Sequence, residues 1–276
     1  MRNLFVYTLL YIALFAEAQL RYPIVGTYKG KSAQGMAICG DKAFLFNDGG
    51  HCRVLNLKSG IFESEFDLAS SENKPHVATA CFGNEILENG NYPLLYVAEF
   101  VGKSRCFVEC INNDSSVLVQ TIEAKDNGKN YRIQCWLVDN SSNHLYSVSG
   151  KQTVDSMGRC PVVIRKYRLP LVSEGDYILL TEQDKREQFE LDFPNCLQGA
   201  TIRNGKMYVA TGFQQSQWHN PRGRRSLKVI DLKKKKVVKD IDLTYITTNE
   251  PEGFDFHGRN ALLFCGQEGG IYKINH

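Results

Sequence analysis

The sequence predicts an all-β protein, a five-bladed β-propeller of four-stranded antiparallel blades, from three observations. A short segment recurs along the chain, further strand-like runs follow each copy, and the copies are tens of residues apart. Each copy begins with a polar residue, continues through small and apolar residues, and reaches a turn residue about six positions later. The copies are residues 34–40, 76–83, 134–140, 198–204 and 252–258.

Two more strands are expected after each copy, and the first four units carry a fourth, such as Ile61–Leu68 or Val237–Leu243. The copies begin 42, 58, 64 and 54 residues apart, which suits units of one four-stranded blade. The expected second strands are 43–46, 94–100, 144–148, 206–211 and 261–265, and the third strands are 53–57, 106–111, 162–169, 227–232 and 270–274.

The last unit has only three strands before the chain reaches His276, while Tyr22–Lys29 is a strand-like segment ahead of the first unit. An unclosed ring would leave a sheet edge and an apolar blade face in water. We therefore expect Tyr22–Lys29 to add the fourth strand to the last blade and close the ring.

Residues 1–18 have the pattern of a signal peptide, since Arg2 precedes an apolar run from Leu4 to Phe15. Ala16, Glu17 and Ala18 then form the small-x-small pattern of a cleavage site. A membrane anchor is the alternative, but the run is shorter than the roughly 20 residues that a span needs. We expect a single propeller domain over residues 19–276, located in the periplasm or secreted.

Composition excludes several classes of protein. The excess of Lys and Arg over Asp and Glu gives a net charge of only +3, which does not favour nucleic acid or an anionic membrane as a partner. The nine cysteines cannot all pair with one another, and Cys39, Cys81, Cys135 and Cys265 lie in apolar strand-like runs. We expect mostly buried thiols. No CxxC pair is present, and neither a metal nor a cofactor is predicted.

One blade resembles a known repeat. Lys206–Thr211, Ser226–Leu232 and Val237–Leu243 contain a Tyr-Val strand, a Val-Ile-Asp strand and a Val-Val strand in succession. This order is similar to the YVTN-type repeat of bacterial propellers, and Ala43–Leu68 is the next best match, without the Tyr-Val pair. The resemblance implies the fold and an exported location. Those propellers share no single chemistry, so no catalytic residue follows from it.

Propeller geometry brings the first residues of the recurring segments to one mouth of the axial channel. Amides, an imidazole and a carboxylate at this mouth suit a polar ligand, and we predict a binding site there. In the alternative interpretation, the same side chains satisfy buried backbone groups and channel water. The five residues are Gln34, His76, Gln134, Gln198 and Glu252.

The loop from Phe213 to Arg225 is expected on the same face, and long loops on a rigid scaffold often carry binding. It contains Trp218, His219 and Arg222, which we add to the predicted ligand-binding residues. An aromatic face and guanidinium groups suit a sugar ring, a planar anion or a partner surface. Alternatively, the loop is solvated and Trp218 folds onto a neighbouring blade.

Two functions stay open at this point. The first is an exported, non-catalytic propeller that binds a polar small molecule, a glycan or a partner protein at the channel mouth. The second is a metal-dependent hydrolase or lactonase of the propeller kind, in which Glu252, with Gln34, His76 and Gln134, would partly supply the ligands of a cation. A single carboxylate is a poor set for a hard cation, and no GxSxG or HExxH motif is present.

The exported protein is predicted to begin at Gln19, because the cleavage pattern ends at Ala18. N-terminal sequencing of the exported material should read Gln19 first. Material that still carried residues 1–18 would contradict this prediction.

Overall fold

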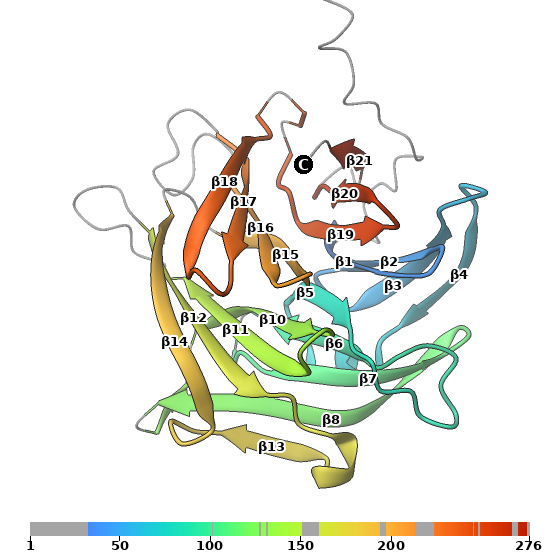
Figure 1. Cartoon of the computed structure of the whole chain (residues 1–276). Coiled ribbons are helices and arrows are strands. Elements are labelled where there is room, and N and C mark those ends of the chain that lie inside the picture. Colours follow the sequence, from blue (N-terminus) through green and yellow to red (C-terminus); the bar gives the residue numbers. More distant parts are fainter. Residues whose placement is uncertain are drawn as a thin grey trace, which may run out of the picture.

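The computed structural model describes residues 33–100, 102–126, 128–130, 132–150, 160–193, 197–212, 224–244, 246–247, 249–266 and 270–274. These residues form an all-β, five-bladed propeller, and the predicted fold class is confirmed (Figure 1). Each blade is an antiparallel sheet whose strands follow chain order from the axis outward, and the short helices are single 3-10 turns.

The first two blades hold strands β1 to β8. Blade 1 contains β1 (Ala33–Cys39), β2 (Lys42–Asn47), β3 (His51–Asn56) and β4 (Phe62–Asp67). Blade 2 contains β5 (Val77–Phe82), β6 (Leu95–Glu99), β7 (Cys106–Asn112) and β8 (Ser115–Asp126). The 3-10 turn η1 (Ala69–Asn73) connects the two blades, and the short β9 (Lys129–Asn130) pairs with the end of β8.

The remaining blades repeat this plan. Blade 3 contains β10 (Ile133–Asp139), β11 (His144–Gly150), β12 (Cys160–Arg168) and β14 (Lys185–Phe193). Blade 4 contains β15 (Leu197–Arg203), β16 (Lys206–Thr211), β17 (Ser226–Asp231) and β18 (Lys236–Asp242). The described part of blade 5 contains β19 (Gly253–His257), β20 (Asn260–Phe264) and β21 (Ile271–Ile274).

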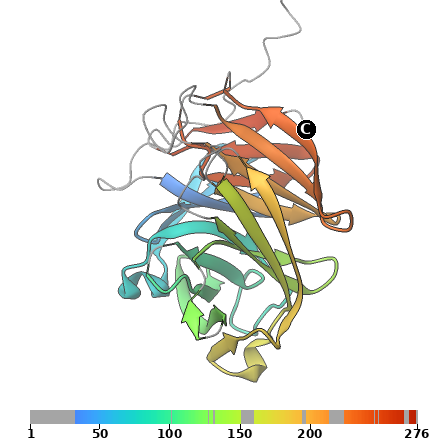
Figure 2. The same ribbon diagram turned by 90° about the vertical axis from the view of Figure 1, so that its left-hand side faces the viewer.

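The innermost strands, β1, β5, β10, β15 and β19, form a closed ring around the axis (Figure 1). Each of them contacts the innermost strand of both neighbouring blades, and β5 also reaches β15 across the axis. Viewed from the side, the blades lie around this ring with their outer strands at the periphery (Figure 2). The axis of the propeller is therefore narrow.

Glycines permit this close approach of backbones. A Cβ at Gly199 of β15 would lie 2.6 Å from Cα of Gly253 in β19. A Cβ at Gly253 would lie 2.6 Å from Cβ of Met36, and one at Gly35 would lie 2.8 Å from the carbonyl oxygen of Ala78. Since two of these contacts involve backbone atoms, no side-chain rotation would make room for a methyl group.

Apolar side chains fill the space between neighbouring blades. Each of the five interfaces holds its own cluster, and the Trp136 ring lies fully buried between blades 2 and 3. Blade 5 joins blade 1 through Phe264 and Ile271, which pack on Met36 and Leu45. The inner strands of each blade are buried on both faces, so they are apolar on both sides, whereas outer strands such as β4 and β18 are partly exposed and more polar.

A strand that the sequence did not predict lies outside blade 2. The connection between β12 and β14 of blade 3 passes through η2 (Val172–Glu174) and then forms β13 (Tyr177–Leu180). β13 pairs in parallel with β8 at the outer edge of blade 2 (Figure 1). β13, which belongs to the chain segment of blade 3, is therefore the outermost strand of the blade 2 sheet, and its pairing with β8 joins the two blades.

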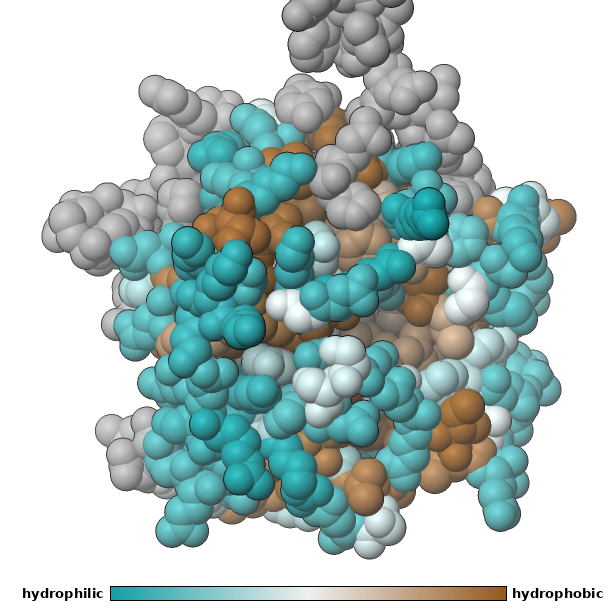
Figure 3. Space-filling model, in the orientation of Figure 1, coloured by the Kyte–Doolittle hydropathy of each residue, from teal (hydrophilic) through white to brown (hydrophobic). Residues whose placement is uncertain are grey.

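Several sequence predictions concern residues outside the described ranges. The closing strand at residues 22–29 and the signal peptide at residues 1–18 both lie there, so they stay predictions. Within the described ranges, no helix is long and apolar enough to cross a membrane. The surface seen in Figure 3 is mostly hydrophilic, with apolar patches separated by polar side chains.

The expectation of mostly buried thiols is confirmed among the described cysteines, although Cys39 is only half-buried. Cys81, Cys135 and Cys265 are buried and free. Burial raises the pKa of each of these thiols to about 12, which keeps them protonated and poorly nucleophilic at neutral pH.

Replacing Gly199 with Ala should destabilise the propeller by at least about 2 kcal/mol, because the new methyl group would press on the backbone of Gly253. Urea unfolding measures the loss. Gly49→Ala is the matched control, because the nearest atom to a Cβ there is a side-chain oxygen at 3.4 Å. Equal stability of the two variants would contradict the close packing at the axis.

Candidate functional site

One face of the propeller collects the features that the sequence singled out. The innermost strands of all blades begin on this face, and the connections between second and third strands return to it. We call it the mouth face. Asn47, Asp48, Gly49 and Gly50 form one of these connections, and Asn47 Oδ1 accepts hydrogen bonds from the backbone N–H groups of Gly49 and His51, both at 2.9 Å.

Two of the predicted amides hydrogen-bond the backbone of their own blade. Gln134 is buried, and its Oε1 accepts a hydrogen bond from the Gly150 N–H at 3.1 Å. Gln198 Nε2 donates to the Gly212 carbonyl at 3.4 Å. In both blades the amide reaches back to the end of the second strand. This is the alternative interpretation of these residues, in which they satisfy backbone groups near the axis.

Gln34 and Glu252 are also buried at the mouth face, with Glu252 only 4% exposed. Burial, followed by a hydrogen bond with the Glu250 side chain, raises the pKa of Glu252 well above its ordinary value. Burial beside a second carboxyl group therefore favours the protonated form of Glu252. Gly266, at the end of the second strand, packs against Glu252.

His76 does not occupy the position of the other four. The pairs Val77↔Glu99 and Ala80↔Val97 of blade 2 correspond to Ala33↔Asn47 and Met36↔Leu45 of blade 1. The residue equivalent to Gln34 is therefore Ala78, and His76 lies two residues earlier, outside β5. The expectation of a polar residue at the same position in all blades is wrong for blade 2, because similar-looking strands can be aligned two residues apart without changing faces.

His76 instead lines a cleft of about 410 Å³ on the mouth face, between blades 1 and 2. We call this the mouth cleft. The imidazole contacts the ring of Phe100 edge-on, with 6.0 Å between centroids, and the His76 carbonyl accepts a hydrogen bond from the Phe100 N–H. The lining residues are Asp48, Asn73, Lys74, Pro75, His76, Glu99 and Gly102.

Glu99, one of the residues that line the mouth cleft, forms an ion pair with Arg105. Arg105 donates from Nε and Nη2 to the two carboxylate oxygens of Glu99, at 2.9 and 2.8 Å. The guanidinium also lies over the Phe107 ring and points Nη1 at Asn73 Oδ1, 3.5 Å away. Since the charges of Glu99 and Arg105 compensate each other, this pair is rigid and close to neutral.

Asp48 and Lys74 are two further charged residues that line the mouth cleft. Asp48 Oδ1 is buried and has no hydrogen-bond partner among the described residues, while its backbone carbonyl accepts from the Val77 N–H. Lys74 is exposed and follows η1 in a left-handed conformation, with φ of 50°. The cleft therefore places an unsatisfied acceptor and a cation close to an imidazole.

The remaining predicted residues are outside the described part of the chain. Trp218, His219 and Arg222 fall in residues 213–223, and nothing tests their role. Within the described ranges, no group of three His, Cys, Asp or Glu side chains is placed to hold a metal ion. The metal-dependent alternative thus has no ligand set in those ranges.

Sequence reasoning missed most of the mouth cleft. Asp48, Lys74, Glu99 and Arg105 carry no motif that would single them out in the sequence. Their common signal is position, because each lies in or next to a connection at the mouth face. Correct alignment of the blades would have located these connections.

Comparisons with known proteins add little about function. No family model matches the chain, and no curated protein sequence matches it. Among solved structures, the β-propeller domain of Cps50 (Swd1) from Myceliophteria thermophila is similar, at 12% identity and a TM-score of 0.44, over 88% of this chain and 84% of that chain. Such a distant likeness says nothing about what this chain binds. The YVTN-type resemblance stays a prediction.

Replacing Glu252 with Gln should make stability less dependent on pH. A carboxyl group whose pKa is raised by folding stabilises the fold below its unfolded value, about 4.3, and this contribution is lost as pH rises through the folded pKa. At pH 8 the Gln variant should therefore be more stable than the wild type, by about 1 kcal/mol or more, and the gain should shrink toward pH 4.

Thermal unfolding of both proteins from pH 4 to pH 8 measures this difference. Glu88→Gln, at an exposed position, serves as the control. If Glu252→Gln and the wild type had parallel stability profiles, the carboxyl group of Glu252 would not be held protonated.

Proposed function

We propose that this protein is a non-catalytic binding propeller that takes a small polar ligand in the mouth cleft. The observation that carries the proposal is the buried Asp48 Oδ1, which lacks a partner among the described residues and lies in a cleft with Lys74 and His76. An unsatisfied buried acceptor costs about 1–3 kcal/mol, and a hydrogen-bond donor on a ligand would recover part of that cost.

The backbone at Lys74 supports the same conclusion. A residue other than glycine in the left-handed region is strained by roughly 1–2 kcal/mol, and such residues concentrate at functional sites. Lys74 follows η1, where Asn or Gly would end the turn with less strain. The lysine therefore costs stability while it supplies a cation at the cleft.

The chemistry of the cleft indicates the class of ligand. A donor such as an ammonium or hydroxyl group would face Asp48, and a carboxylate or another acceptor would face Lys74. Amino acids, hydroxy acids and uronic acids combine these groups at the right size, because sites for small ligands commonly have about 300–1,000 Å³. His76 would add a further hydrogen bond.

The exported location and the loop with Trp218 belong to this proposal. An exported binding protein would meet its ligand outside the cytoplasm, as residues 1–18 predict. The described ends of this loop, the end of β16 and the start of β17, lie on the mouth face. Its aromatic and cationic residues suit the same kind of polar, partly anionic ligand.

Replacing Lys74 with Asn should weaken ligand binding about tenfold or more, because it removes the cation while Asn tolerates the left-handed backbone. A panel of amino acids, hydroxy acids and uronic acids is first screened by thermal shift, since a ligand at 100 times its Kd stabilises by about 2.7 kcal/mol. The best compound is then titrated calorimetrically into the wild type and the variant.

Lys235→Asn is the matched control. Lys235 is also a lysine in the left-handed conformation, with φ of 54°, but it lies in the hairpin between β17 and β18. Both variants should fold, and only Lys74→Asn should lose affinity. Equal affinity in the two variants, or no binding by any compound of the panel, would refute the proposed site.

A further inference from the structure

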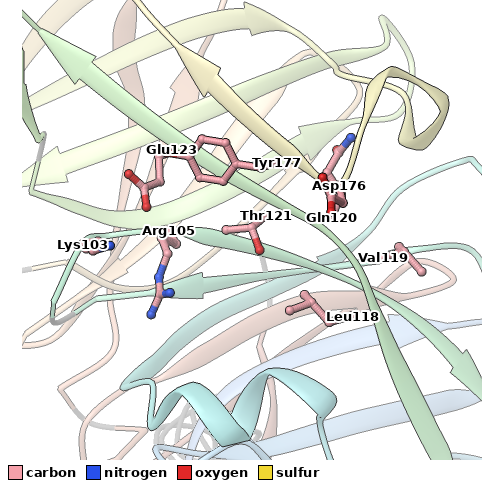
Figure 4. Close-up of a pocket in the computed structure, with 9 residues that line it drawn as sticks. All are labelled: Lys103, Arg105, Leu118, Val119, Gln120, Thr121, Glu123, Asp176 and Tyr177. Atoms are coloured by element: carbon pink, nitrogen blue, oxygen red, sulfur yellow. The ribbon is translucent and has the colours of Figure 1, made fainter.

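A second cleft lies outside blade 2, and we call it the outer cleft. It has a volume of about 390 Å³ and is lined by residues of β8, of the start of β13 and of the connection between β6 and β7 (Figure 4). Arg105 lines it, whereas Glu99, which pairs with Arg105, lines the mouth cleft. The two clefts are therefore separated by this ion pair and have different walls.

An aromatic side chain lies open at the outer cleft. Tyr177 is the first residue of β13, and half of its surface is exposed. Figure 4 shows its ring beside Glu123, to which the Tyr177 hydroxyl donates a hydrogen bond. Partial burial and this bond raise the pKa of Tyr177, so the hydroxyl stays protonated and bound. A ring fixed at its hydroxyl loses little conformational freedom when a ligand stacks on it.

A buried amide holds the connection that leads to Tyr177. Gln120 is 1% exposed, and its Nε2 donates to the carbonyls of Leu171 and Gly175 at 2.9 and 2.8 Å. These bonds fix the connection between β12 and β13 against β8, and so fix the position at which Tyr177 begins β13.

Charged side chains of both signs line the outer cleft. Lys103 supplies a cation, and Glu123 and Asp176 supply two carboxylates. The charge of Arg105 is already compensated by Glu99. Such a site disfavours an anionic ligand. It can hydrogen-bond a neutral ligand whose groups donate and accept at the same time.

We propose that the outer cleft is a binding site for a neutral saccharide, with Tyr177 as the stacking platform. The C–H face of a pyranose ring lies flat against an aromatic ring, which supplies much of the contact area. Its hydroxyls donate to Glu123 and Asp176 and accept from Lys103. Aromatic, acidic and basic groups around one small cleft match this chemistry better than that of an ion or an apolar molecule.

The site needs both blades 2 and 3. Asp176 and Tyr177 come from the connection of blade 3, while Lys103, Gln120 and Glu123 come from blade 2. The parallel pairing of Tyr177 with Thr121 sets the distance between the two sides. β13 therefore contributes a side chain to the proposed site in addition to joining the two blades.

The test is a calorimetric titration of the whole protein with neutral disaccharides, namely maltose, lactose, cellobiose and diacetylchitobiose. At least one should bind with a Kd below about 10 mM. Tyr177→Ala should weaken that binding about tenfold, while Tyr177→Phe, which keeps the ring, should weaken it less than about threefold.

Leu179→Ala is the matched control. Leu179 follows two residues later on the same face of β13, is 41% exposed and does not line the cleft. The Leu179→Ala variant should bind the disaccharide with the affinity of the wild type. Unchanged melting temperatures should show that all variants are folded.

Absence of binding by all four disaccharides, or equal affinity of Tyr177→Ala and the wild type, would overturn this inference. Saccharide binding that Lys74→Asn abolished and Tyr177→Ala left intact would place the saccharide in the mouth cleft. That result would overturn the outer site and leave the proposed function standing. If no charged ligand bound in a Lys74-dependent way while a saccharide bound in a Tyr177-dependent way, the proposed function of the mouth cleft would be refuted. The saccharide site in the outer cleft would then stand.

Discussion

Close contact between the innermost strands is the constraint on which this propeller depends. Five strands can surround so narrow an axis only if their backbones meet where they cross, and Gly35, Gly199 and Gly253 provide those places. Two of the three follow a buried polar residue, Gln34 or Glu252, and the third follows Gln198. Glycine permits the approach, and the neighbouring polar side chain lies at the mouth of the axis.

The blades beyond the axis are held by apolar interfaces of similar kind. The inner strands of each blade are buried on both faces, which explains why they read as continuous apolar runs and why free cysteines serve as small apolar residues. The interface between blades 1 and 2 also contains buried polar contacts. η1 docks there through Ser70, whose N–H donates to buried Glu109, and the Glu99–Arg105 pair lies beside it.

Both clefts lie around this polar region. The mouth cleft lies at connections that end at the mouth face, and the outer cleft lies beside the paired strands β8 and β13. A rigid ion pair between them allows each cleft to keep its own electrostatic character. An acceptor and a cation on the mouth side suit a ligand with opposite charges, and the hydrogen-bonding groups around Tyr177 on the outer side suit a neutral one.

The sequence by itself determined the class of fold, the number of blades and the approximate bounds of their strands. Recurring strands such as Gln198–Asn204 are local patterns, and two-sided burial leaves a strong apolar signal. Only the tertiary structure decided which polar residues serve the backbone and which face a cleft. Gln134 looks the same in sequence whether it binds Gly150 or a ligand, and His76 can be shifted by two residues without changing faces. β13 pairs with blade 2, whereas the strands before and after it in the sequence belong to blade 3. This pairing depends on the unpaired outer edge of β8, which the local sequence of Tyr177–Leu180 does not reveal.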